Sequence, residues 1–275
     1  MAGSPIAAPS SPHTSQDVIG ALAQMGIQSG DHVLLHSSYR SLGAVEGGPE
    51  AVLNAFLELI GPGGNLMLPT FNYTSPLPEP CYDPALTPCR TGVLCELGRS
   101  KGLRSLHPTH SVAVIGPDAE ELTKGHLQGR AFGPGSPIDR MARRGGKILL
   151  LGVGQVANST IHVGEEYAMI PKSTARTDAL PPVKVRIPTG ELIEHKLDSS
   201  PSCSAAFGGL EAFLREHDEI VDGRLGACLI QSMSGMAVLS RTENLLRKNP
   251  RALLCRNPQC GSCRGMETNI SLLKL

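Results

Sequence analysis

The sequence has few aromatic residues, no excess of either charge and no long apolar run. Aromatic residues make up 3% of the 275 residues, and 25 basic side chains balance 25 acidic ones. Nucleic-acid binding calls for a basic surface or stacking rings, so nucleic acid is excluded as the main partner. No apolar run approaches the roughly 20 residues that span a bilayer, and the first dozen residues lack the charged and apolar regions of a secretory signal. We therefore expect a cytoplasmic protein without a membrane partner.

Several common nucleotide-binding and hydrolase motifs are also absent. The chain contains no Walker loop and no G-x-G-x-x-G, and its G-x-S-x-G string at 98–102 does not follow a predicted strand as a nucleophile elbow does. Gly152-Val153-Gly154 is only a fragment of a dinucleotide-binding fingerprint, and we interpret it as the tight end of a strand. With 40% hydrophobic and 18% charged residues, the composition is that of a globular protein.

The hydrophobic pattern predicts an α/β fold. Apolar runs at 33–35, 66–68, 112–115 and 147–151 predict buried strands, and helical spacing predicts helices at 15–25 and 48–60, the second ended by Gly61-Pro62. Such alternation indicates βαβ units and a largely parallel sheet. Residues 183–187 and 191–196 predict an added antiparallel hairpin, and helices are expected at 209–217 and 240–248. We expect a flexible tail at 1–14 and one domain at 15–275, with a cysteine-containing segment at 255–263.

Two candidate segments contain histidine next to hydroxyl groups. His36, Ser37 and Ser38 follow a predicted strand, where ligands bind in open parallel sheets. Their hydroxyls and backbone amides could hold phosphate oxygens, or the segment could be a serine-rich turn. His107 and His110 have a spacing that can share a metal, but Pro108 between them favours a rigid structural corner.

A third candidate follows the strand at 147–151. If a helix begins near Thr160, His162 lies on the same face as Glu165 or Glu166. A carboxylate beside an imidazole fixes its tautomer, as a general base requires. The alternative is an ion pair on the protein surface, which would contribute little to stability.

Three of the eight cysteines are clustered near the end of the sequence. Cys255, Cys260 and Cys263 have the spacing of metal ligands but number only three. A structural zinc site would need a fourth ligand from Cys203, Cys228 or His217. The alternative is three thiols in a polar tail.

Six segments in order resemble the aminoglycoside 3-N-acetyltransferase family. They are residues 31–43 (DHVLLHSSYRSLG), 47–49 (GGP), 61–71 (GPGGNLMLPTF), 104–111 (RSLHPTHS), 132–137 (FGPGSP) and 160–165 (TIHVGE). Each motif is weakly specific, but their order and spacing are specific. The resemblance covers about residues 16–171.

The resemblance implies an α/β/α sandwich around a mostly parallel sheet, and direct acetyl transfer from acetyl-coenzyme A to an amine. It implies that His162 is the general base, that Glu165 shapes the acceptor site, that Asp198 orients His162 and that Thr160 positions the thioester carbonyl or the amine. The implied coenzyme A site consists of His36, Ser37, Ser38, Ser41, Leu42, Gly43 and Ser111.

The acceptor implied is an aminoglycoside, or an amine of a natural-product pathway, and the protein is expected to be a monomer or homodimer. The long loop that follows Phe71 has only Glu79 and Asp83 as acidic residues, fewer than a polycationic acceptor would favour. Two alternatives remain: a metal-dependent hydrolase built on His107, His110, His162 and Glu165, and a non-catalytic module that binds coenzyme A.

Overall fold

The computed structural model describes residues 11–72, 79–172, 180–197 and 203–274. Its main sheet has seven strands in the order β4-β5-β2-β1-β6-β10-β9. The strands are β1 (His32–Ser37), β2 (Asn65–Pro69), β4 (Leu103–Arg104), β5 (Val112–Ile115), β6 (Lys147–Leu151), β9 (Val221–Leu225) and β10 (Cys228–Ser234). The predicted α/β class is confirmed.

Parallel pairing is found in the middle of this sheet. β1 pairs in parallel with β2 on one side and with β6 on the other. The outer pairs β2–β5, β4–β5, β6–β10 and β9–β10 are antiparallel. Because β1, β2 and β6 are buried on both faces, their sequences read as continuous apolar runs, which is why these strands could be predicted.

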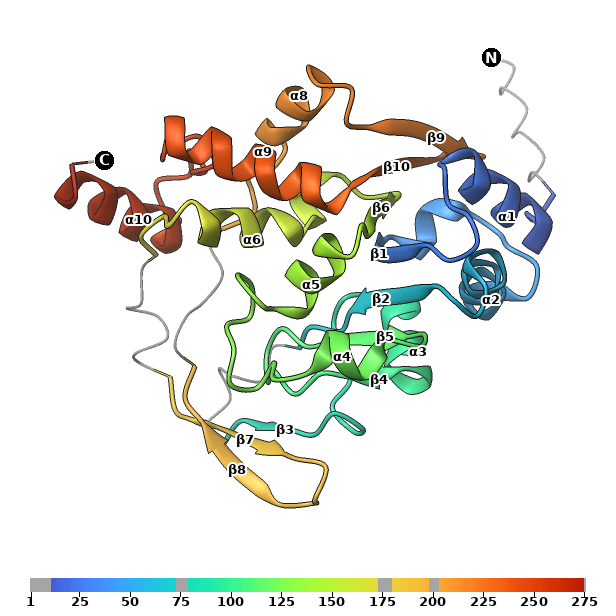
Figure 1. The fold of residues 1–275 in the computed structure, drawn as a ribbon, viewed down its shortest axis with the longest axis horizontal. Coiled ribbons are helices and arrows are strands. Elements are labelled where there is room, and N and C mark those ends of the chain that lie inside the picture. The colour runs from blue at the N-terminus through green and yellow to red at the C-terminus, as the bar shows by residue number, and fades with distance from the viewer. Residues whose placement is uncertain (1–10, 73–78, 173–179, 198–202, 275) are drawn as a thin grey trace, which may run out of the picture.

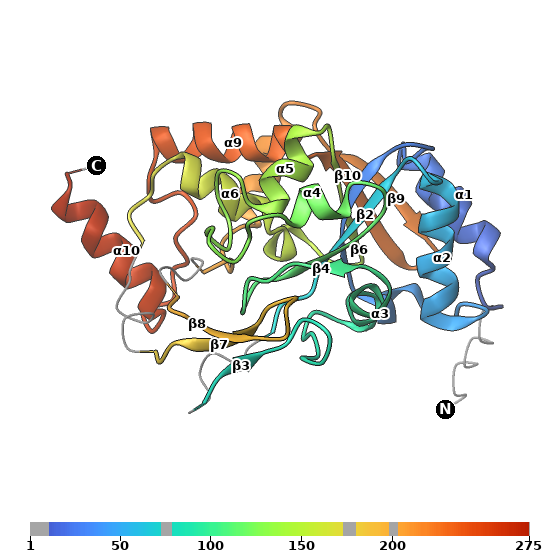
Figure 2. The ribbon, with the colours of Figure 1, turned by 60° about the horizontal axis from the view of Figure 1, so that its bottom comes forward.

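The central strands lie between two helical layers (Figures 1 and 2). Leu34, Met67 and Leu150 belong to one core cluster, and Leu35 and Leu149 belong to the other. The first layer contains α4 (Ala119–Thr123), α5 (Pro137–Arg143), α6 (Thr160–Tyr167), α8 (Gly209–Arg215) and α9 (Gly235–Lys248), and the second contains α1 (Ser15–Gln24), α2 (Gly48–Ile60) and α3 (Val93–Lys101). This is the α/β/α sandwich that the resemblance implied.

A second, three-stranded sheet lies beside the sandwich (Figure 2). It consists of β3 (Cys81–Tyr82), β7 (Val183–Arg186) and β8 (Leu192–His195), and β7 and β8 form the predicted antiparallel hairpin. Gly190 closes its turn at φ +87°, a conformation that favours glycine.

The ends of the chain differ from the sequence-based expectation in two ways. Residues 1–10 of the expected tail lie outside the described residues, but His13 pairs with Val45 and Thr14 caps α1 in a capping box with Asp17. Ordered structure thus begins before residue 15. A further helix, α10 (Gly261–Leu272), was not predicted. Among the described residues, no helix combines the length and apolar character needed to cross a membrane.

Helix α6 packs closely on α9 through a glycine. A Cβ atom placed on Gly164 would lie 2.5 Å from Thr242 Cβ and 3.0 Å from the Leu239 carbonyl oxygen. We therefore expect Gly164→Ala to lower the free energy of unfolding by about 1–3 kcal/mol, the usual cost of overpacking. In a protein of this size each kcal/mol lowers the melting temperature by about 2–4 °C, which a thermal melt measures.

Gly20→Ala is the matched control, because Gly20 is exposed in α1 and a Cβ there meets nothing within 4 Å. Alanine should stabilise this helix by about 0.5–1 kcal/mol. Equal melting temperatures for the two variants would show that the α6–α9 contact has room for a methyl group.

Candidate active site

The loops that follow β1 and β6 meet at the carboxyl ends of the parallel strands. β1 leads into a 3-10 turn, η1 (Tyr39–Leu42), and β6 leads through Gly152 and a second 3-10 turn, η2 (Gln155–Ala157), into α6. The Ser159 backbone N–H donates to His36 Nε2 at 3.4 Å, which joins the two loops. Ligands bind at this end of open α/β sheets.

His162 and Glu165 form a buried pair on α6. His162 Nδ1 lies 2.8 Å from Glu165 Oε2, and the two side chains are 9% and 2% exposed. Because helical residues three apart share a face, the helix itself sets this contact. When Nδ1–H donates to the carboxylate, the lone pair of the neutral imidazole is on Nε2, which can accept a proton.

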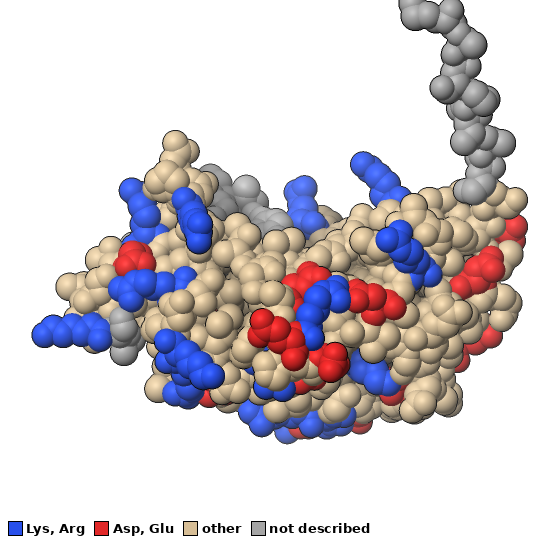
Figure 3. All heavy atoms as spheres, turned by 90° about the horizontal axis from the view of Figure 1, so that it is seen from above, with Lys and Arg blue, Asp and Glu red and all other residues tan. Residues whose placement is uncertain are grey.

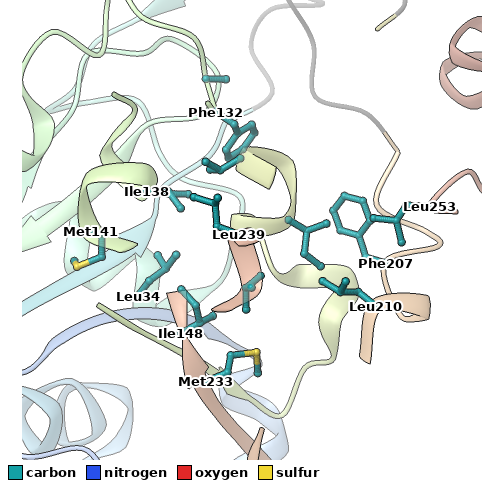
Figure 4. Close-up of a cluster of buried hydrophobic side chains, with 14 of the residues drawn as sticks. Leu34, Phe132, Ile138, Met141, Ile148, Phe207, Leu210, Met233, Leu239 and Leu253 are labelled. Carbon is teal, nitrogen blue, oxygen red and sulfur yellow. The ribbon is translucent and has the colours of Figure 1, made fainter. Parts of the chain in front are cut away.

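Two aromatic rings pack against the His162 imidazole. The Phe132 ring centroid lies 4.9 Å from that of His162, and the Phe207 ring packs edge to face at 4.7 Å. Both phenylalanines belong to the core cluster shown in Figure 4. They restrict the orientation of the imidazole. No local sequence signal predicts the role of Phe207, since its contact with α6 depends on tertiary packing.

Thr160 begins α6, two residues before His162. Its side chain is fully buried, and its Oγ1 has no hydrogen-bond partner among the described residues. A buried hydroxyl without a partner costs about 1–3 kcal/mol, so it calls for an explanation. A substrate group that hydrogen-bonds to this hydroxyl would provide one.

The predicted coenzyme A residues at 36–43 lie together in and after β1. Ser37 and Ser38 are half-buried, Leu42 is buried, and Gly43 is exposed at φ +73°. The Ser41 hydroxyl donates to the Ser38 carbonyl oxygen at 2.6 Å. These contacts hold the segment as a defined turn.

A cavity of about 810 Å³ opens beside this turn. Ser41 and residues 152–154 line one side, and the charged lining residues are Arg215, Arg224, Glu211 and Asp222. Gly152 allows the close approach of the two loops, because its φ is +65° and a Cβ there would lie 1.7 Å from Ser41 Oγ. The face of the molecule seen in Figure 3 has acidic and basic side chains in proximity. Arg215, which lines the cavity, pairs with Glu211 and Asp222.

Ser111 lies in a different environment from the 36–43 turn. It is fully buried, donates to the Thr70 carbonyl oxygen at 2.8 Å and accepts from Arg104 Nε at 3.0 Å. Its hydroxyl is thus part of the network that holds the buried Arg104 side chain. No surface of Ser111 is open to a ligand in this conformation.

The histidines of the 107–110 segment form a corner, as the presence of Pro108 predicted. His107 Nδ1 accepts from the backbone N–H groups of Thr109 and His110 at 3.3 and 3.1 Å. His126, which sequence analysis missed, has its ring centroid 5.0 Å from that of His107. Burial lowers the pKa of His110 to about 3 and that of His126 to about 4, so both are neutral near pH 7.

The four cysteines Cys203, Cys255, Cys260 and Cys263 have their Sγ atoms within 4.8 Å of one another. No other group of potential metal ligands lies this close together among the described residues. His107, His110, His162 and Glu165, the residues of the hydrolase alternative, therefore do not form a metal-ligand group. Cys228, the other cysteine considered as the fourth ligand, instead contacts Ser41 Oγ at 3.1 Å. Asp198 lies outside the described residues.

Comparison with known families gives one match over most of the chain. The model of the aminoglycoside 3-N-acetyltransferase family matches residues 34–247. Aminoglycoside N(3)-acetyltransferase IV of a Salmonella species is 29% identical over 256 residues, covering 91% of this chain and 93% of the relative. Aminoglycoside N(3)-acetyltransferase III, also of Salmonella, is 37% identical over 188 residues, covering 62% of this chain and 66% of the relative.

Solved structures give the same result. The apoenzyme of aminoglycoside acetyltransferase AAC(3)-IVa has a TM-score of 0.79 and 27% identity, covering 94% of this chain and 98% of that one. A histidine-to-alanine mutant of AAC(3)-IVa in complex with a gentamicin has a TM-score of 0.80, with the same identity and coverage. AAC-IIIb in a binary complex with CoASH has a TM-score of 0.71 and 24% identity, covering 86% of this chain and 97% of that one.

Burial makes His36 a source of acid sensitivity. Loss of hydration lowers its pKa from 6.5 to about 3, so the unfolded chain binds a proton more readily than the folded one. Stability is therefore lost as the pH falls below about 6.5, by about 2 kcal/mol at pH 5 from this residue alone. Between pH 8 and pH 5, the free energy of unfolding should fall by about 2 kcal/mol less in His36→Gln than in the wild type, as measured by urea unfolding.

His217→Gln is the control for this experiment, because His217 is exposed. Its pH dependence should equal that of the wild type. If His36→Gln also follows the wild type, His36 is accessible to protons in the folded state.

Proposed function

We propose, from the premise that this chain belongs to the aminoglycoside 3-N-acetyltransferase family, that it transfers acetyl directly from acetyl-coenzyme A with His162 as the general base. The chain is an aminoglycoside N-acetyltransferase by its family. The observation that carries the assignment of the base is the buried contact of 2.8 Å between His162 Nδ1 and Glu165. This contact lies at the start of α6, beside the 36–43 turn.

Acetyl-coenzyme A is the cosubstrate that best suits the loops at this end of the sheet. A solved neighbour of the same fold contains CoASH. In this chain, the half-buried Ser37 and Ser38 supply hydroxyls for phosphate groups, and Arg224 of the adjacent cavity supplies positive charge. The hydrogen bond from the Ser159 N–H to His36 Nε2 joins this region to the start of α6.

The reaction needs one proton acceptor at the attacking nitrogen. As the neutral amine forms a bond with the thioester carbonyl carbon, its nitrogen loses a proton to His162 Nε2. The C–S bond then breaks, the thiolate takes up a proton and the imidazole returns to its neutral form. A positioned base of this kind contributes about 10²–10⁴ in rate. The Thr160 hydroxyl is a donor for the developing oxyanion.

Glu165 has an orienting role toward His162, and the same role for Asp198 stays a prediction, because Asp198 lies outside the described residues. Its carboxylate fixes the His162 tautomer and stabilises the imidazolium that forms during attack. The next residue, Glu166, is paired with Arg130 and Lys172, so its charge is already offset. We therefore assign the role of orienting His162 to Glu165 and not to Glu166.

The acceptor we propose is an amino group of an aminoglycoside or of a related natural product. Structures of relatives contain a gentamicin and apramycin. No observation favours the hydrolase or the non-catalytic module.

Replacement of His162 tests this proposal. His162→Ala should lower kcat for acetyl transfer by about 10²–10⁴ while coenzyme A binding stays within about twofold of the wild type. Glu165→Gln keeps the shape but not the charge, and should lower kcat by a smaller factor. Thiol release from acetyl-coenzyme A, measured with a panel of aminoglycosides and small biosynthetic amines, gives the rates.

His217→Ala is the control, because His217 lies exposed at the end of α8 and should leave the rate unchanged. Wild-type turnover in His162→Ala would refute the assignment of the base. Thiol release that does not depend on any amine would refute amine acetylation.

Thr160→Val separates a functional hydroxyl from a structural one. Valine keeps the shape and removes the buried Oγ1 without a described partner, so stability should be equal or higher, by up to about 2 kcal/mol. If the hydroxyl stabilises the transition state, kcat should fall about 10- to 100-fold in the same variant. Steady-state kinetics and urea unfolding measure the two effects, and an unchanged kcat would exclude the role.

A further inference from the structure

Four cysteines from two parts of the chain meet beside α10. Cys203 precedes α8, while Cys255, Cys260 and Cys263 surround the start of α10. Their Sγ atoms lie within 4.8 Å of one another. Cys203 supplies the fourth ligand that the C-terminal motif lacks.

The spacing of the sulfur atoms suits a tetrahedral metal ion. Zinc bound by four thiolates at about 2.3 Å puts its sulfur atoms about 3.8 Å apart. The described sulfurs need only a small contraction to reach that distance. All four cysteines are free thiols, so no disulfide occupies the cluster. Four soft ligands without a carboxylate or imidazole select zinc over magnesium or calcium.

The surrounding backbone stabilises thiolates. The Cys255 N–H donates to Cys263 Sγ at 3.3 Å, and the Ala205 N–H donates to Cys203 Sγ at 3.4 Å. Cys260 is the N-cap of α10, where the helix dipole favours negative charge. Such contacts orient metal ligands from outside the coordination sphere.

We propose that Cys203, Cys255, Cys260 and Cys263 form a structural zinc site that joins α10 to the turn before α8. This turn leads to Phe207, whose N–H donates to the Ser204 carbonyl oxygen at 3.0 Å. Phe207 and Leu253 belong to the core cluster of Figure 4, and Met266 and Ile270 of α10 pack into the same cluster. The zinc site therefore holds the C-terminal helix in the core.

The site also has a consequence for the reaction, which rests on the proposed role of His162. The Phe207 ring packs against the His162 imidazole, and Cys203 lies four residues before it. Zinc fixes the start of this short segment and so makes Phe207 a positioning residue. Loss of zinc should disturb the orientation of the base while leaving the 36–43 turn intact.

Metal analysis of the full chain tests the site directly. Protein purified without chelator under reducing conditions should contain about one zinc ion per chain by inductively coupled plasma mass spectrometry. Cys203→Ser and Cys260→Ser should lose the ion and melt at lower temperature. Cys81→Ser, which changes an exposed cysteine outside the cluster, should keep the zinc ion and the wild-type melting temperature.

A wild-type experiment covers the case in which the serine variants do not fold. Cobalt should replace zinc in the intact protein and give the strong absorption bands of a tetrahedral thiolate site. A wild type that stays metal-free after incubation with zinc, full zinc content in Cys203→Ser, or an intact mass that reveals a disulfide within the cluster would each overturn the zinc site.

A split between kcat and KM tests the positioning role. In zinc-depleted protein below its melting temperature, kcat should fall about 10- to 100-fold while KM for acetyl-coenzyme A changes less than about twofold. Phe207→Leu should lower kcat in the same way with its zinc retained. An unchanged kcat in the folded, zinc-depleted protein overturns the positioning role. If the protein transfers no acetyl group at all, the proposed function fails, while the zinc content still tests the metal site by itself.

Discussion

Burial of β1, β2 and β6 on both faces is the constraint on which the rest of the structure depends. Each strand sends alternate apolar side chains into the two helical layers, as Leu34 and Leu35 do. Polar side chains on these strands are therefore confined to the ends, where the backbone leaves the sheet. His36 is at one such end, and the loop from β6 to α6 begins at the next. The register between β1 and β6 thus decides which loop residues meet.

Glycines at two positions allow the elements that form the site to pack closely against each other. Gly152 allows the Ser41 side chain to lie against the loop after β6, and Gly164 allows α6 to lie against α9. Larger side chains at either position would separate elements that carry the proposed cosubstrate and base residues. Because densely packed interiors transmit such shifts, the geometry of the site is a property of the whole sandwich.

The sequence predicts the parts of the structure whose signals are local. The strand at Lys147–Leu151 and the helix at Gly48–Ile60 have continuous or periodic apolar residues and glycine at their ends. The pairing of His162 with Glu165 was also predictable from helical spacing. In contrast, α10 begins Gly261-Ser262 and has Gly265 in its interior, so its stability comes from packing and not from propensity. Phe207, His126 and Cys203 join their clusters from distant segments, and no local pattern reports such contacts.

Charge around the proposed base, His162, follows from burial as well as from pairing. Desolvation keeps His36 and His110 neutral at the pH of the reaction, since it lowers the pKa of each to about 3. A charged His110 would repel a proton on His162, because the two imidazoles are near enough to interact electrostatically. An aminoglycoside approaches as a polycation, so additional imidazolium charges would repel the acceptor too. Neutral histidines around the single carboxylate-paired His162 therefore favour both steps proposed for this site, the binding of a cationic acceptor and the uptake of its proton.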